Sequence, residues 1–411
     1  MVDSCKMKCK RPNRNEQKEG SMKFLRHPVM FFLFLSLAFH DSSVGQQKSL
    51  ADVYKTGKVR FVAEITIDDN ALPEDVFFVG YGDIAVDWKG NVYILDSRAK
   101  NIKKFNSTGK FIKVIGREGQ GPGEFSSPYR LACSGDRFVV WDMMGFRFSL
   151  FTLEGDPIKS VRHSFPEKGN PMKIRTLPSG EFIVGLEKVY FEPKKPQDFS
   201  IVLFSPEMEE LKTIYTQQVW RNIWGIPNAP NIPVPFSPQV YWDISPVGGI
   251  VIGFSEEYEI DVYDKEKAKL ASFTHDYKPV DVTNEDKEAF FKSIVFSSSD
   301  GNVVRKEPPP AQKEHTKFPE FKPAFSGIAV DSEGNILICP YVKDKKEEGK
   351  YFDAFDSQGN FIARVRIESE HSFYSLSRAQ IIDGYFWERE TDKDGYIKIV
   401  KYRIGEASDD N

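Results

Sequence analysis

The chain has 411 residues, with 56 Lys and Arg against 60 Asp and Glu, so its formal net charge is −4. This mildly acidic balance argues against a nucleic-acid partner, because such a partner requires a concentrated basic face. Aromatic residues make up 14% of the chain, and 29 Gly and 25 Pro supply the turns that many short strands require. The composition therefore favours stacked β-sheets over a helical bundle.

The N-terminus carries a targeting signal. Residues 1–21 are polar and without pattern, as expected of a mis-called start codon with the true start at Met22. Residues 22–45 begin with basic side chains, continue with an apolar run of 11 residues and end in small residues. Because such a run is too short to span a bilayer, it predicts a cleaved signal peptide, an exported (periplasmic or extracellular) protein, and no membrane span after cleavage. Residues 46–57 are expected to be a linker.

Six glycine-centred turns, each between two strand-like segments, recur from about residue 82 to the end of the chain. Their glycines are 45, 45, 68, 86 and 50 residues apart, at Gly90, Gly135, Gly180, Gly248, Gly334 and Gly384. A period near 45 residues with several short strands per unit is typical of a β-propeller, in which no unit can bury both of its faces alone. The sequence therefore predicts an all-β fold in which residues 58–411 form one propeller of six four-stranded blades.

Two of the units carry a recognisable motif. Residues 82–128 read GDIAVDWKGNVYILDSRAKNIKKFNSTGKFIKVIGREGQGPGEFSSP, and residues 325–367 follow the same plan without the Asp after the second strand. The first string resembles the NHL repeat, with its D-x-x-G-N-x-Y-x-x-D core, its F-x-x-x-G-K-F turn and its glycine-rich crossover. The resemblance implies a six-bladed propeller of the exported bacterial type, most of whose members have no defined activity. Since the repeat already explains the glycine-rich stretch, that stretch is not a phosphate-binding loop.

The two ends of the chain predict how the ring closes. The last unit supplies only three strands, at 376–382, 385–389 and 396–403, while a β-rich stretch at 59–67 precedes the first unit. Pairing this N-terminal stretch as the outer strand of the last blade would close the ring and leave no seam.

Two insertions interrupt the period. Residues 220–238 are rich in Pro and aromatic side chains, so they cannot form a central strand and are expected to lie as an extended loop over one face. Residues 281–323 open with a capping signature that predicts a short helix over 285–296.

Three charged residues recur at one position of the repeat, five residues before the turn glycine. They are Arg130, Arg175 and Asp243, in units two, three and four. In one interpretation the two guanidinium groups hold a carboxylate or phosphate at the mouth of the channel. In the other, these charges pair between blades or contact channel water, because the faces of a blade point at its neighbours.

The aromatic insertion and the strand after it form a second candidate surface. In one interpretation Trp220, Trp224 and Trp242 make a stacking surface for a sugar or an apolar peptide. In the other, these side chains pin the long loop against the ring.

Signals for metal binding and catalysis are weak. Cys5 and Cys9 leave with the leader, and the remaining sequence has no His or Cys cluster at ligand spacing and no G-x-S-x-G motif. Asp83, Asp87, Asp243 and Asp331 are possible ligands of the kind that propeller lactonases use, but acidic residues at strand ends are also frequent turn formers. No metal site is therefore predicted.

Together these features predict an exported, monomeric propeller that binds a protein, peptide or glycan, without catalysis and without a cofactor. The alternative is a metal-assisted hydrolase or lyase of the lactonase kind, with its site at the channel mouth and a divalent metal as cofactor.

Overall fold

The computed structural model describes residues 48–80, 83–190, 192, 195–226, 229–294, 296–297, 303–304, 308, 310–368, 380–382, 385–391 and 397–407. The polar extension 1–21, the signal peptide 22–45 and the turn glycine Gly384 lie outside the described residues. In the part of the chain that the structure describes, no helix combines the length and apolar character needed to cross a membrane.

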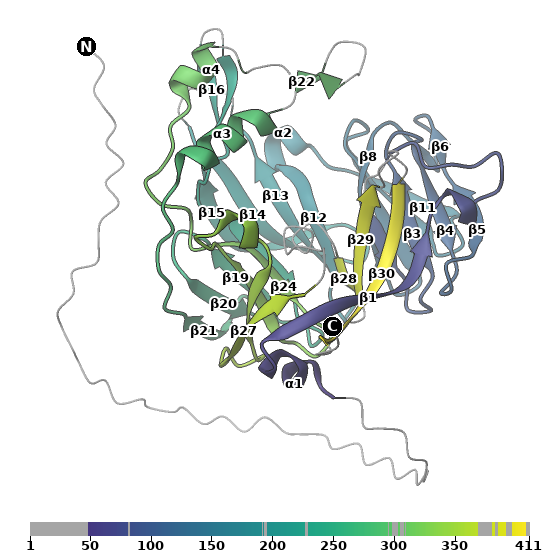
Figure 1. The fold of residues 1–411 in the computed structure, drawn as a ribbon. Helices are drawn as coiled ribbons and strands as arrows, with labels where there is room; N and C mark the ends of the chain where they lie inside the picture. Colours follow the sequence, from purple (N-terminus) through teal and green to yellow (C-terminus); the bar gives the residue numbers. More distant parts are fainter. Residues whose placement is uncertain are drawn as a thin grey trace, which may run out of the picture. The chain divides into compact units, whose positions relative to one another are not determined.

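One compact unit spans Lys48–Asn411, and four four-stranded sheets and one eight-stranded sheet form its six four-stranded blades (Figure 1). From inner to outer strand, blade one is β2 (Ile84–Val86), β3 (Val92–Asp96), β4 (Asn101–Phe105) and β5 (Phe111–Ile115), and blade two is β8 (Pro128–Ser134), β9 (Arg137–Asp142), β10 (Arg147–Thr152) and β11 (Pro157–Arg162). Blade three is β12 (Asn170–Thr176), β13 (Phe182–Lys188), β14 (Gln197–Phe204) and β15 (Glu210–Val219), and blade four is β18 (Val240–Ile244), β19 (Ile250–Phe254), β20 (Glu259–Tyr263) and β21 (Lys269–Thr274). Blade five is β24 (Phe325–Val330), β25 (Ile336–Pro340), β26 (Tyr351–Phe355) and β27 (Phe361–Ile367), and blade six is β28 (Gln380–Ile382), β29 (Tyr385–Thr391), β30 (Ile397–Glu406) and β1 (Lys58–Ile67). The fold is a six-bladed β-propeller, as predicted.

The remaining elements lie in the connections. Four α-helices are described: α1 (Leu50–Lys55), α2 (Phe165–Lys168), α3 (Asn284–Ser293) and α4 (Pro310–His315). Two 3₁₀ turns are described, η1 (Asp69–Ala71) and η2 (Lys345–Glu347). Three two-stranded pairs complete this set: β6 (Arg117–Glu118) with β7 (Glu124–Phe125), β16 (Asn222–Ile226) with β17 (Ala229–Pro233), and β22 (Phe296–Ser297) with β23 (Val303–Val304).

The N-terminal strand closes the ring, which confirms the prediction. β1 pairs antiparallel with β30 from Val59 opposite Glu406 to Ile67 opposite Ile399, and Figure 1 shows purple β1 alongside yellow β30. The beginning of β1 also pairs in parallel with the outer strand of blade five, at Lys58 opposite Arg366. The first strand of the unit therefore holds blades five and six together as one eight-stranded sheet.

The hydrophobic core is divided among the interfaces between neighbouring blades. Each of the six interfaces has its own cluster of buried side chains. In blade two, Phe138 on β9 packs toward blade one, whereas Val139 and Trp141 on the same strand pack toward blade three. This follows from the period-2 alternation of a strand, which here buries both faces of every blade.

The turn after each inner strand is formed as the glycine pattern predicts. The five described turn glycines, from Gly90 to Gly334, have φ between +56° and +95°, a region that side chains disfavour. In blade one the Asp87 carboxylate accepts hydrogen bonds from the backbone N–H of Lys89 and from the backbone and side chain of Asn91, at 2.8–2.9 Å. These bonds fix the turn without a contribution from its exposed side chains.

Both insertions lie on one face of the propeller. Because successive strands run in opposite directions, the connections between second and third strands and between blades share one face, and the other turns share the opposite face. Residues 220–238 contain the hairpin β16–β17 rather than an extended loop, since each strand there pairs with the other. Residues 281–323 begin with α3, whose Thr283–Asp286 capping box matches the predicted helix start to within one residue.

Lys322 fastens the second insertion to the ring. Its ammonium lies 3.2 Å from Asp286 at the start of α3 and 3.0 Å from Glu348 of blade five. The rings of Phe236 and Tyr341 also contact this ammonium, at 5.6 and 5.3 Å from their centroids. One buried cation thus joins both insertions to the connection between β25 and β26.

The segment expected to be a linker contains a packed helix. Ser49 caps α1 by accepting from the backbone N–H of Asp52. The Tyr54 hydroxyl donates to Asp331 at 2.9 Å, and the backbone N–H of Leu50 donates to Glu333 at 2.8 Å. Short as it is, α1 forms because blade five supplies the apolar surface and acceptors that its own sequence lacks.

Candidate functional site

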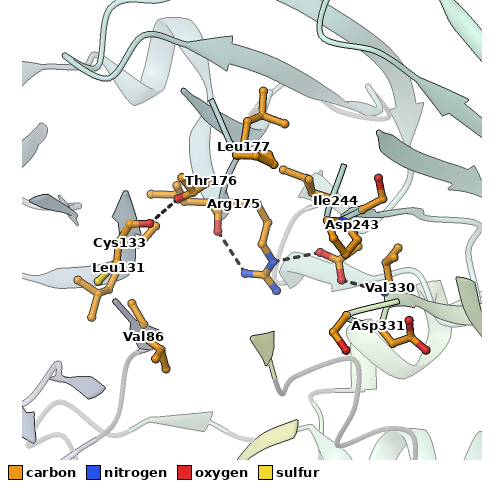
Figure 2. A pocket seen from close by; sticks show the side chains of 17 residues that line it. Val86, Leu131, Cys133, Arg175, Thr176, Leu177, Asp243, Ile244, Val330 and Asp331 are labelled. Carbon is orange, nitrogen blue, oxygen red and sulfur yellow. Dashed lines mark hydrogen bonds and ion pairs between the residues drawn. The ribbon is translucent and has the colours of Figure 1, made fainter. Parts of the chain in front are cut away.

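A chamber of about 420 Å³ lies on the axis of the propeller (Figure 2). Its wall is formed by the inner strands of blades one to five and by the turns that follow them, so it lies at the face opposite the insertions. The lining residues are Ala85, Val86, Leu131, Ala132, Cys133, Ile174, Arg175, Thr176, Leu177, Pro178, Asp243, Ile244, Ser245, Pro246, Val330, Asp331 and Ser332.

Asp243 is the centre of a charge cluster in this wall. Arg175 Nε donates to Asp243 Oδ1 at 3.1 Å, and the backbone N–H of Val330 donates to Oδ2 at 3.3 Å (Figure 2). Lys173 Nζ lies 3.4 Å from the same Oδ1 atom. Lys173 and Arg175 share one face of β12 because they are two residues apart. Two cations on one carboxylate leave the cluster with one net positive charge.

The surroundings shift the pKa values of this cluster. Burial alone would raise the pKa of the Asp243 carboxyl, but the charges of Lys173 and Arg175 outweigh it, and the pKa lies below its ordinary value. Burial lowers the pKa of the Lys173 ammonium to about 8, against the opposing effect of Asp243. Asp243 is therefore ionised at neutral pH and orients both cations.

Asp83 places a second carboxylate on the inner edge of blade one. It accepts hydrogen bonds from the backbone N–H groups of Ile84 and of Leu131 in blade two, each at 3.1 Å. Burial raises its pKa, partly opposed by the charges of Arg130 and Arg175. Asp83 therefore joins two blades and lies within electrostatic reach of the chamber guanidinium.

Arg130 does not join Arg175 in one site. Its Nε donates to the carbonyl of Met172 in blade three at 2.5 Å, its Nη1 donates to the carbonyl of Tyr129, and its guanidinium lies 3.8 Å from the Tyr129 ring centroid. Arg130 is absent from the chamber lining. The strand registers explain this: β8 continues to Ser134, so Ala132 lies at the depth of Arg175, and Arg130 lies two residues further along the inner strand. Arg130 and Arg175 therefore approach different partners.

The structure describes the ring contacts of Trp242 and the backbone contacts of Trp220. Trp242 is buried in the cluster between blades three and four, with Lys173 Nζ 4.9 Å from its ring centroid. The Trp220 carbonyl accepts hydrogen bonds from the side chains of Ser237 and Gln239, which close the base of the hairpin. Trp224 lies on β16, and its side chain lies outside the described residues. Trp242 thus packs between two blades, and a stacking surface formed by Trp220 and Trp224 stays a prediction.

The acidic residues considered as metal ligands are engaged in local bonds. Asp331 accepts from the Tyr54 hydroxyl and from Asn335, in the same turn geometry that Asp87 adopts in blade one. In the part of the chain that is described, no group of three or more His, Cys, Asp or Glu side chains is close enough together to hold a metal ion.

Sequence reasoning missed two residues near the chamber. Lys173 lies two residues before Arg175, and period-2 alternation of the inner strand would have placed it on the same face. Trp88 lies two residues before its turn glycine, a position that lines the chamber in other blades. Period-2 alternation is the signal that would have found Lys173, and alignment on the turn glycines is the signal that would have found Trp88.

The comparisons with known proteins agree with this fold. A family described as a 6-bladed beta-propeller matches residues 73–225. The match is to this family rather than to the NHL repeat, so the NHL resemblance stays a prediction. Among curated proteins there is no match.

Solved structures resemble the chain at low sequence identity. A member of the DUF4221 family from Bacteroides vulgatus has a TM-score of 0.50 at 12% identity, covering 85% of this chain and 99% of that one. A protein from Bacteroides fragilis described as exported has a TM-score of 0.48 at 13% identity, with 85% and 95% covered. A virginiamycin B lyase from Staphylococcus aureus has a TM-score of 0.37 at 14% identity, with 84% and 99% covered. At such identities the likeness concerns the fold alone.

Proposed function

We propose that this protein is an exported binding protein whose ligand inserts a carboxylate into the axial chamber, where Arg175 binds it. The carboxylate belongs to a peptide or glycan of which only one end enters the propeller. The fold is compatible with binding and with catalysis alike, so the proposal rests on the chamber and not on the architecture.

The observation that carries the proposal is the state of the Arg175 side chain. Its Nε is engaged by Asp243 and its Nη1 donates to the Ile174 carbonyl at 3.2 Å, while 20% of the side chain is exposed. A guanidinium has five N–H donors in a fixed fork, so these two bonds leave donors for a further acceptor. Asp243 pre-orients the fork, which lowers the entropy lost when a second carboxylate binds.

The size and charge of the chamber fit one end of a larger ligand. A volume of about 420 Å³ lies in the lower part of the range for small-molecule sites, enough for one terminal residue or one sugar ring. Within the cluster, Lys173 and Arg175 outnumber Asp243, which favours an anion over a neutral group at Arg175, while Asp331 adds one carboxylate to the chamber lining.

Titration calorimetry with small carboxylates, such as N-acetylated amino acids and glucuronate, tests this proposal. Arg175→Gln should weaken binding by about tenfold or more, because a hydrogen bond to a charged group contributes about 1.5–3 kcal/mol. Arg130→Gln is the matched control, since Arg130 lies on the inner strand of the neighbouring blade but outside the chamber lining. Equal affinity of the Arg175→Gln variant and the parent, with both folded, would overturn the proposal.

Two further measurements address the other parts of the proposal. Export predicts that the secreted chain begins after residue 45, which N-terminal sequencing of the protein from its native host would test. Metal analysis of the purified protein separates binding from the lactonase alternative, because a stoichiometric divalent ion whose removal abolishes ester hydrolysis would favour the enzyme.

A further inference from the structure

One position of the repeat forms the rim of the chamber. In blades three to five the residue two before the turn glycine is the first residue of the turn and lines the chamber, as Pro178, Pro246 and Ser332. The same position in blade one is Trp88. The repeat therefore places an indole at the rim, on the same face as the chamber opening.

The Trp88 side chain has no packing role in its turn. It is 72% exposed, and the turn is held by Asp87, Asn91 and the left-handed backbone of Gly90. The other contact described for the ring is the ammonium of Lys89, 4.9 Å from its centroid. The indole contributes nothing to the core at this position, and its exposed face is available to a ligand that reaches the rim.

The wall of the chamber favours a carbohydrate over a peptide. An extended peptide is recognised along one straight strand edge, whereas the short inner strands here present their edges around an axis. The hydroxyls of Thr176, Ser245 and Ser332 belong to the same wall. Thr176 donates to the Cys133 carbonyl and Ser245 accepts from the Gly249 N–H, so Thr176 can still accept from a sugar hydroxyl and Ser245 can still donate to one. An indole face at the rim suits the C–H face of a second ring.

We propose that the ligand is a uronic-acid oligosaccharide. One sugar unit places its carboxylate against Arg175 inside the chamber, and a neighbouring ring stacks on Trp88 at the rim. This inference rests on the proposed function, and it adds the chemical class of the ligand and a second contact.

The experiment uses the purified full chain and three probes: a trigalacturonate, the same trisaccharide with its carboxylates reduced to alcohols, and a tripeptide with a C-terminal aromatic residue. Affinities are measured by calorimetry for the parent, Trp88→Ala, Trp88→Phe and Met144→Ala. Met144 is the matched control, because it is 61% exposed in a turn on the opposite face. Trigalacturonate should also shift Trp fluorescence in the parent but not in Trp88→Phe.

Support would be trigalacturonate binding that weakens about tenfold in Trp88→Ala, partly recovers in Trp88→Phe, is unchanged in Met144→Ala, and weakens at least as much when the carboxylates are reduced. Two results would overturn the inference. If the tripeptide binds with dependence on Arg175 and trigalacturonate does not bind, the ligand class is wrong while the proposed function stands. If no carboxylate probe binds in an Arg175-dependent way, the proposed function fails as well.

Discussion

Replacing Asp243 by Asn removes the charge that holds the chamber cluster together. Asn has nearly the same shape and can still accept the hydrogen bond from the Val330 N–H. The change therefore isolates the ionic part of the cluster, since Lys173 and Arg175 then face each other without an anion between them.

The expected cost is about 3 kcal/mol. Removing one partner of a buried ion pair costs about 3–5 kcal/mol, and the lower end applies because both cations keep some exposure, 27% for Lys173 and 20% for Arg175. With an unfolding entropy of about 2.1 cal/mol/K per residue over about 360 residues, this corresponds to a fall in melting temperature of about 4 °C.

The cost should also depend on pH. The pKa of Lys173, about 8 in the folded protein against an ordinary 10.5, falls further when Asp243 no longer opposes the effect of burial. Because the pKa of Lys173 is lower in the folded than in the unfolded state, the folded protein releases this proton at a lower pH. The free energy of unfolding therefore rises with pH between the folded-state and the unfolded-state pKa values. The difference between Asp243→Asn and the parent should therefore shrink between pH 6.5 and 8.5.

Chemical denaturation of four proteins gives the assay: the parent, Asp243→Asn, Arg175→Gln and the double variant. Removing both partners should cost at least 1 kcal/mol less than the sum of the single changes, because neither leaves the other unpaired. Additive costs, or a cost below 1 kcal/mol for Asp243→Asn alone, would refute the assignment of this cluster as a coupled ion pair.

Three further substitutions test the fold, each by denaturation against the parent. Lys267 has a left-handed backbone (φ 71°) in an exposed turn where three other blades have glycine, so Lys267→Gly should raise the free energy of unfolding by about 0.5–1 kcal/mol; a loss would contradict this. Gly359→Ala should lower it by about 2 kcal/mol or more, because φ is 83° and an added Cβ would lie 2.3 Å from the Phe273 ring; a neutral result would show that the turn relaxes. Burial lowers the pKa of His163, so the unfolded state takes up the proton first and stability should fall as pH drops below about 6.5. His163→Gln should flatten that dependence between pH 7.5 and 5, and an unchanged slope would assign it to other groups.

The periodic part of the fold was predictable from the sequence. The turn glycines mark a backbone conformation that other residues disfavour, and their spacing therefore reports the blade period even where the rest of the repeat has diverged. The role of β1 followed from counting strands. The last blade has three strands of its own, and the unassigned strand at the other end of the chain supplies the fourth. Both inferences rest on backbone geometry, which varies little between blades.

The non-periodic parts were not predictable to the same extent. The prolines of residues 220–238 excluded a central strand, but the hairpin β16–β17 depends on pairing that propensity does not encode. Helix α1 forms against Asp331 and Glu333, which lie about 280 residues away in sequence. Whether Arg130 and Arg175 converge depends on the registers of β8 and β12, and the sequence left those registers open.

The inner-strand residues five positions before each turn glycine also show why stability alone does not account for the chamber. At the position five residues before the turn glycine, blades one and five have Ala85 and Ala329, which pack in the cores between blades. Blades two, three and four have Arg130, Arg175 and Asp243, whose burial carries a desolvation cost that an ion pair only partly offsets. If this position served only the packing between blades, a small residue such as Ala85 or Ala329 would suffice in every blade. Of these three charges, Arg175 and Asp243 line the chamber, and Asp243 holds Arg175 so that its remaining donors are available to an anionic ligand on that side of the axis.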